Sequence, residues 1–265
     1  MKKSLLLTTT LLWCLCAVAQ SYTIEREVPY RNSKEAYTQQ RCRVDVAHKS
    51  TTKAVPVVVW FHGGGLTGGD RFVPNELLTK DYVIVAVGYR LSPHVSVSEI
   101  IDDAAAAVAW TFDNVARYGG DPSKIYLAGH SAGGYLVDMV GLNRAYLAKY
   151  GFEADSLAGI IPFSGQAITH FEQRRCMGMN PTQPLIDTLA PLYYVRGDAA
   201  PMLIVSGDRE QELYGRYEET AYFWRMLKLA GHKDVTFYEL DGFNHGDMCG
   251  PAYDLLLKFI DQREK

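Results

Sequence analysis

The sequence has few cysteines, no long basic run and no low-complexity segment, and each of these shortages excludes a class of protein. Five cysteines in 265 residues are too few for a disulfide-dense mini-protein. Lysine and arginine never form a run longer than two and the net charge is −3, so we expect no nucleic acid partner. With 48% hydrophobic residues, the composition also excludes a disordered chain. A soluble globular protein with a sizeable core remains.

The apolar stretch near the N-terminus, Leu5–Val18, is too short for a comfortable transmembrane helix. It follows two lysines, and Ala17-Val18-Ala19 has the small–x–small pattern at which signal peptidase cuts. We expect residues 1–19 to be a signal peptide and the mature chain to begin at Gln20. The protein would then be exported, either to the periplasm or to the medium, with no integral membrane segment after cleavage.

Three cysteines lie beyond the predicted signal peptide, namely Cys42, Cys176 and Cys249. An odd number in an exported protein permits one disulfide and one free thiol, or no disulfide at all. None of the three has the spacing of a metal ligand, and no H-E-x-x-H motif is present. We therefore expect neither a metal nor a cofactor.

From Val55 onward the chain alternates strand-like and helix-like patterns, which predicts one α/β domain over residues 20–265. Such alternation implies crossovers between parallel strands, and hence a mostly parallel central sheet with helices on both faces. Residues 22–48 indicate two earlier strands at an antiparallel edge. The expected later strands are 57–62, 82–89, 124–130, 157–163, 202–207 and 235–240. The expected helices are 97–118, 132–149, 211–230 and 252–262.

Residues 166–200 form the one long segment without clear periodicity. An irregular segment of this length within a compact domain is typical of a functional loop, so we interpret it as a small lid. Little sequence is left for anything larger, and we expect a minimal cap over the site.

Gly129-His130-Ser131-Ala132-Gly133 matches the G-x-S-x-G pattern of a nucleophile elbow. In such an elbow a serine occupies a strained turn between a strand and a helix, and the flanking glycines avoid steric overlap. The pattern alone is weak because chance produces it in some chains of this composition. Here a buried-strand pattern precedes it and a helical pattern follows it, which is the context that the motif requires.

A second glycine motif, His62-Gly63-Gly64-Gly65, follows another predicted strand. A phosphate-binding loop is the alternative interpretation, but no G-K-[ST] follows and the G-x-G-x-x-G spacing is absent. Glycines also let backbone N–H groups approach a developing oxyanion without obstruction by a Cβ. We therefore predict an oxyanion hole made by the N–H groups of Gly64, Gly65 and Ala132.

The two motifs together resemble the α/β-hydrolase fold, and within it the HGGG-type carboxylesterases related to hormone-sensitive lipase. The chain also resembles small cap-less bacterial esterases, among them acetylxylan and feruloyl esterases, over roughly residues 55–260. Tyr89-Arg90-Leu91-Ser92-Pro93 is similar to the Y-R-L-x-P segment of that family. His94 is a departure, because many members carry an acidic residue there.

The resemblance implies a triad in the chain order serine, acid, histidine. Ser131 would be the nucleophile, and His245, which follows the last predicted strand, would be the base. The acid should follow the strand that ends near Gly207. The usual spacing of the family selects Glu210, and Asp208 is the alternative.

We expect from this an exported serine carboxylesterase that acts through an acyl-enzyme, on a small-molecule or carbohydrate ester such as an acetyl or feruloyl ester. Phe163, Met177 and Met179 are candidates for lining the acyl pocket. Two other hypotheses stay open. The first is an arylformamidase-like amide hydrolase, and the second is an inactive hydrolase-fold domain that serves as a binding module.

Overall fold

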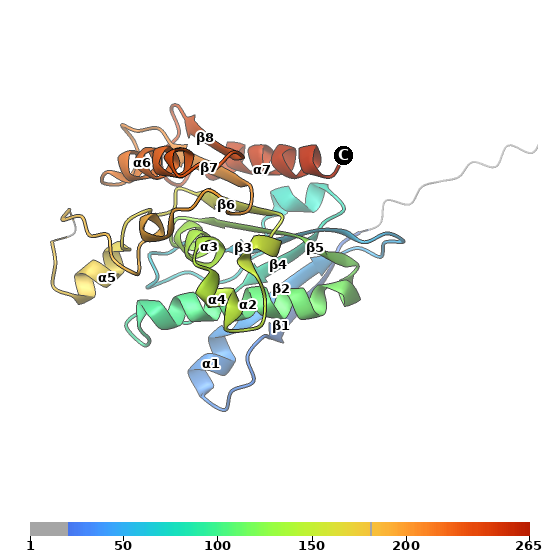
Figure 1. The fold of residues 1–265 in the computed structure, drawn as a ribbon. Helices are drawn as coiled ribbons and strands as arrows, with labels where there is room; N and C mark the ends of the chain where they lie inside the picture. The colour runs from blue at the N-terminus through green and yellow to red at the C-terminus, as the bar shows by residue number, and fades with distance from the viewer. Residues whose placement is uncertain (1–20, 181) are drawn as a thin grey trace, which may run out of the picture.

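The computed structural model describes residues 21–180 and 182–265. A single mixed β-sheet forms the centre of the fold. Within these residues the sheet has eight strands in the order β1-β2-β4-β3-β5-β6-β7-β8 (Figure 1). β2 pairs antiparallel with both β1 and β4, and every other neighbouring pair is parallel. The strands are β1 (Thr23–Pro29), β2 (Arg43–His48), β3 (Val55–Phe61), β4 (Val83–Val87), β5 (Gly120–His130), β6 (Gly159–Phe163), β7 (Met202–Gly207) and β8 (Val235–Leu240). The predicted antiparallel edge and parallel centre are confirmed.

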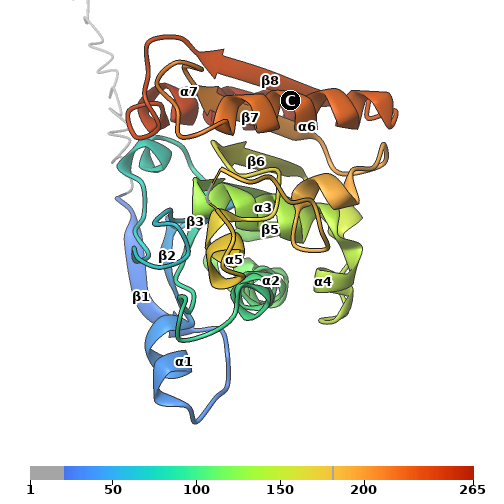
Figure 2. The ribbon, with the colours of Figure 1, turned by 90° about the vertical axis from the view of Figure 1, so that its left-hand side faces the viewer.

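Helices cover both faces of this sheet (Figures 1 and 2). The α-helices are α1 (Ala36–Arg41), α2 (Val97–Asn114), α3 (Ala132–Leu142), α4 (Arg144–Ala148), α5 (Phe171–Cys176), α6 (Arg216–Leu229) and α7 (Cys249–Arg263). The short 3-10 helices are η1 (Asn75–Thr79), η2 (Val115–Tyr118), η3 (Ala154–Ser156) and η4 (Pro191–Tyr194).

Strand β3 shows why the sheet has two cores. Side chains along a strand alternate between its faces. Val57, Val59 and Phe61 therefore join one buried cluster with α2, α3 and α6, while Val58 and Trp60 join a second cluster with α7 and η1. Such a strand is apolar at every position because both of its faces are covered.

Two of the predicted helices differ most from the structure. The helix expected over 132–149 is broken at Asn143, whose side chain accepts a hydrogen bond from Ala145 N and caps α4. The helix expected over 211–230 begins only at Arg216, because Gly215 adopts φ +62° and the residues before it form a loop. That loop contains part of the candidate site.

The predicted signal peptide, residues 1–19, lies outside the described residues. Among the described helices there is none with both the length and the apolar character needed to cross a membrane. Cys42, Cys176 and Cys249 are all free thiols, so none of these three cysteines forms a disulfide. This was one of the two alternatives that their odd number allowed.

Candidate active site

The candidate nucleophile, Ser131, lies in the turn between β5 and α3. Its φ of +56° and ψ of −116° fall outside the usual regions for a residue with a side chain. Its N–H donates to the carbonyl of Phe163 over 2.8 Å, which ties the turn to the neighbouring strand β6. The predicted elbow is present, and Ser131 stands at the carboxyl edge of the parallel strands.

The two glycines of the elbow are required by close approaches of the backbone. A Cβ on Gly129 would lie 2.6 Å from the carbonyl carbon of Gly133, and one on Gly133 would lie 2.7 Å from the carbonyl oxygen of His62. Real Cβ atoms do not come this close to backbone atoms. The glycines therefore let the start of α3 pack directly against the end of β3.

His245 connects Ser131 to a carboxylate. Its Nε2 lies 2.9 Å from Ser131 Oγ, and its Nδ1 lies 2.8 Å from Oε2 of Glu212. Because a carboxylate only accepts hydrogen bonds, Nδ1 carries the hydrogen and Nε2 is left to accept from the serine hydroxyl. The structure thus brings Ser131 and His245 together as predicted, with Glu212 as the third member.

The predicted acid, Glu210, and its alternative, Asp208, are both wrong. Glu210 is exposed to solvent. Asp208 instead closes the turn after β7, since its carboxylate accepts from Glu210 N over 2.8 Å and from Gly242 N over 2.7 Å. The N–H groups of Gln211 and Glu212 both donate to Asp208 O, and this helical turn brings Glu212 back toward the end of β7.

Both oxygens of the Glu212 carboxylate are satisfied by hydrogen bonds. Oε1 accepts from Ser164 Oγ over 2.6 Å and from Gly207 N over 3.0 Å, while Oε2 accepts from Leu213 N and His245. Burial raises the pKa of this side chain, of which only 1% is exposed, but these hydrogen bonds and the positive charge of His245 outweigh it and lower the pKa to about 2. Glu212 is therefore an anion at neutral pH.

His130 holds the loop that carries His245. Its Nε2 donates to the His245 carbonyl over 2.8 Å, and the two rings lie 4.7 Å apart between centroids. Burial and the positive charge of His245 lower the pKa of His130 to about 4, so its ring is neutral at pH 7. Asn244 adds to the support, because its Oδ1 accepts from the N–H groups of Gly246 and Asp247.

The glycine loop passes next to the nucleophile. A Cβ on Gly63 would lie 3.3 Å from Ser131 Cβ. Gly64 has φ +113° and Gly65 has φ +64°, values that favour glycine. Within residues 21–180 and 182–265, the N–H groups of Gly64, Gly65 and Ala132, the predicted oxyanion hole, donate no hydrogen bond to another backbone group.

His62 and Tyr89 pack together next to the glycine loop. Their rings stack with centroids 4.3 Å apart, and the Tyr89 hydroxyl donates to the His62 carbonyl over 2.7 Å. Burial lowers the pKa of His62 to about 4, so the ring stays neutral at pH 7 and its Nδ1 donates to Gly63 O. The Y-R-L-x-P segment thus helps to shape the glycine loop.

A pocket of about 210 Å³ opens beside the loop and the acid. It is lined by Gln166, Phe171, Arg174, Leu213, Tyr214 and Arg216. Phe171 lies against the glycine loop, since a Cβ on Gly65 would be 2.9 Å from the tip of its ring. The lining comes from the segment predicted as a lid, which projects from the sheet in Figure 1, from the loop before α6, and from the first residue of α6, Arg216.

The side chains that we expected to line an acyl pocket lie elsewhere. Phe163 is fully buried and packs against Trp60 in the second core cluster, with ring centroids 5.8 Å apart. Met177 is exposed and, like Met179, is outside the lining of the pocket beside the triad.

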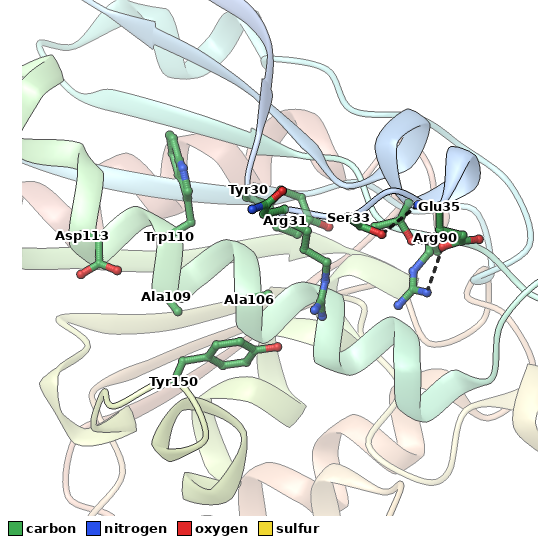
Figure 3. Close-up of a pocket in the computed structure, with 12 residues that line it drawn as sticks. Tyr30, Arg31, Ser33, Glu35, Arg90, Ala106, Ala109, Trp110, Asp113 and Tyr150 are labelled. Carbon is green, nitrogen blue, oxygen red and sulfur yellow. Dashed lines mark hydrogen bonds and ion pairs between the residues drawn. The ribbon is translucent and has the colours of Figure 1, made fainter.

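A separate hollow of about 600 Å³ lies between α2 and the β1–α1 loop (Figure 3). None of the triad residues lines it. Its floor includes Ala106 and Ala109, and Arg90 at one end is paired with the buried carboxylate of Asp103 over 2.8 Å. In the part of the chain that the structure describes, no three His, Cys, Asp or Glu side chains are grouped to hold a metal ion.

Comparisons with known proteins agree with this architecture. Esterase LipC of Mycobacterium tuberculosis is 27% identical over 242 residues, which cover 80% of this chain and 59% of LipC. The chain thus spans less than two thirds of that relative. A truncated carbohydrate esterase from gut microbiota superposes with a TM-score of 0.76 at 17% identity, covering 92% of this chain and 98% of the other.

A second solved structure, a propionate-bound esterase of Thermogutta terrifontis, superposes with a TM-score of 0.71 at 20% identity, covering 90% and 93% of the two chains. These likenesses establish the α/β-hydrolase fold. The sequence profile of the BD-FAE family matches residues 44–217, from β2 to the start of α6. The chain therefore has the α/β-hydrolase fold and belongs to the BD-FAE family.

Proposed function

We propose that the protein is a serine carboxylesterase in which Ser131, His245 and Glu212 act as the triad. The observation that carries this proposal is the imidazole of His245, hydrogen-bonded to the serine through one nitrogen and to a buried carboxylate through the other. This is the arrangement that activates a hydroxyl nucleophile. The esterases among the similar proteins support the same reaction class.

In the first half of the reaction, Ser131 Oγ bonds to the acyl carbon of the ester as its proton moves to Nε2 of His245. The tetrahedral intermediate then collapses, and the alcohol leaves with the proton from Nε2. Water attacks the acyl-serine by the same route and releases the carboxylic acid. Throughout, Glu212 keeps the hydrogen of the imidazole on Nδ1 and stabilises its charged form.

The N–H groups of Gly64, Gly65 and Ala132 would bind the oxygen that becomes negative in each tetrahedral intermediate. Ala132 also opens helix α3, where the positive end of the helix dipole favours an anion. Donors of this kind contribute about 10²–10³ in rate each in well-studied hydrolases.

For the substrate, we propose an ester of a carbohydrate with an acetyl or aromatic acyl group such as feruloyl. The similar structure from gut microbiota is named as a carbohydrate esterase, which supports the sugar part. The pocket beside the triad, with Phe171 and Leu213 in its wall, is of a size to take an acyl group. An exported location, based on residues 1–19, would place the enzyme where polysaccharides are met.

Labelling with a fluorophosphonate, followed by peptide mass spectrometry, tests the reaction class. We expect the label on Ser131 in the native protein, and none in Ser131→Ala or in heat-denatured protein. A folded protein that takes no label would favour the inactive binding module.

Turnover of p-nitrophenyl acetate, methyl ferulate, acetylated xylan and N-formylkynurenine tests the substrate. Preference for the formamide, N-formylkynurenine, would overturn the ester proposal.

A further inference from the structure

A second serine, Ser164, contacts two members of the candidate triad. It directly follows β6 and is fully buried. Its Oγ donates to Oε1 of Glu212 over 2.6 Å and lies 3.0 Å from Nδ1 of His245. Ser164 therefore contacts both the acid and the imidazole, although it has no place in the three-residue mechanism.

The hydrogen-bond roles at this point are fixed by chemistry. The Glu212 carboxylate has no hydrogen to give, so the hydroxyl of Ser164 donates to it and has only lone pairs left for His245. The hydrogen on Nδ1 is then shared between Oε2 of Glu212 and Oγ of Ser164. Removing the hydroxyl would leave Oε1 with Gly207 N as its one donor.

The backbone of Ser164 is held so that the hydroxyl points at the acid. Its φ of +48° is rare for a residue with a side chain. Its N–H donates to Val205 O over 2.7 Å, and its carbonyl accepts from the guanidinium of Arg216. Arg216 is in turn paired with the buried carboxylate of Glu219 over 3.1 Å. The backbone of Ser164 is thus strained, hydrogen-bonded through both its N–H and its carbonyl, and in contact with the candidate site. Such a combination points to a functional role.

We propose that Ser164 is a positioning residue that holds the Glu212 carboxylate against His245 during catalysis. The proposal rests on the proposed esterase function. Its action is indirect: with the hydroxyl present, Oε1 is held by two donors and Oε2 faces Nδ1. Without the hydroxyl, Oε1 keeps only Gly207 N, so the carboxylate is less firmly oriented and the imidazole loses orientation with it.

Two variants of Ser164 separate positioning from stability. Ser164→Ala and Ser164→Gly both remove the hydroxyl, but glycine accepts φ +48° without strain and protects the fold. We expect both to lower kcat for p-nitrophenyl acetate about 10–100-fold, the effect of a lost hydrogen bond to a charged group, with KM within about 3-fold. The matched control is Ser206→Ala, because Ser206 is also fully buried and its hydroxyl has no partner within the described residues. It should keep kcat within about 2-fold.

A double-mutant cycle with Glu212→Ala shows whether Ser164 acts through the acid. We expect Ser164→Ala to cost less than about 3-fold further in that background. A Ser164→Gly enzyme as active as the Ser206→Ala control, or a full additional loss in the Glu212→Ala background, would overturn the proposal. A wild-type protein that neither hydrolyses esters nor labels at Ser131 would instead overturn the esterase function, and this proposal with it.

Discussion

Nδ1 of His245 lies 2.8 Å from the carboxylate of Glu212, and the turn that brings the two together is closed by Asp208. The acid therefore stands five positions beyond Gly207, the last residue of β7. Gly207 accommodates it directly, since a Cβ there would lie 3.0 Å from Oε1 of Glu212. Asp208 thus has a structural role in the turn, and Glu212 has the proposed catalytic role.

The first prediction distinguishes the structural role of Asp208 from the proposed catalytic role of Glu212. Glu212→Gln should lower kcat/KM for p-nitrophenyl acetate about 10²–10⁴-fold, because the imidazole loses the anion that orients it and stabilises its charged form. Glu210→Gln, a change of the same chemistry on an exposed residue two positions earlier, should stay within about 2-fold. Asp208→Asn should lower the melting temperature, because its carboxylate accepts two backbone hydrogen bonds. If Glu210→Gln proved the more damaging of the two glutamate variants, the assignment of Glu212 would be wrong.

The strands, the elbow and the glycine loop could be predicted because their signals are local. Gly129, Ser131 and Gly133 lie within five residues, and the strand before them is apolar because both faces of the sheet are covered. His245 could be predicted because it closely follows the last strand, β8, whose carboxyl end lies at the same edge of the sheet as that of β5.

Glu212 could not be found in the same way, because the signal that places it is not local. Its position depends on Asp208 binding Gly242, a residue 34 positions away. The helical pattern after Gly207 also made Glu212 look like part of the next helix, although α6 begins only at Arg216. Gly215, at φ +62°, was the available signal that the helix starts later. Ser164 left no signal, since a lone serine after a strand is common.

A second prediction concerns the contact between α3 and β3. Gly133→Ala should destabilise the protein severely, because a Cβ there would overlap the Phe61 carbonyl and one of the two backbones must move. Gly250→Ala is the control, as a Cβ at this helical position meets nothing within 4 Å. It should be neutral or stabilising by about 0.5–1 kcal/mol. Thermal unfolding of both variants measures the two effects. A Gly133→Ala protein as stable as wild type would contradict the close packing of α3 against β3.

A third prediction follows from His62 and His130. Burial lowers the pKa of each to about 4, whereas in the unfolded chain it is near 6.5. Between these values the unfolded chain binds more protons than the folded protein, so acid favours unfolding. Each histidine should therefore remove up to about 1.4 kcal/mol of stability per pH unit as the pH falls from about 6.5 to 4.

Chemical denaturation of His130→Gln between pH 7 and 4 measures this contribution. The glutamine amide places an N–H donor near the position from which Nε2 of His130 donates to the His245 carbonyl, but it does not titrate, so the slope of stability against pH should become shallower than in wild type. A slope equal to that of wild type would show that His130 is not held neutral by burial.

The fourth prediction concerns Phe171, which lies between the glycine loop and the pocket beside the triad. If that pocket takes the acyl group, the ring contributes an aromatic contact to a feruloyl ester and almost nothing to an acetyl ester. An aromatic pair is worth about 0.5–1.5 kcal/mol, so Phe171→Ala should raise KM for methyl ferulate up to about 10-fold and change p-nitrophenyl acetate less than 3-fold. Tyr193→Ala, an exposed aromatic of the same irregular segment outside the pocket, is the matched control. An equal loss of kcat on both esters would show instead that Phe171 supports the glycine loop, and the acyl group would then have to bind elsewhere.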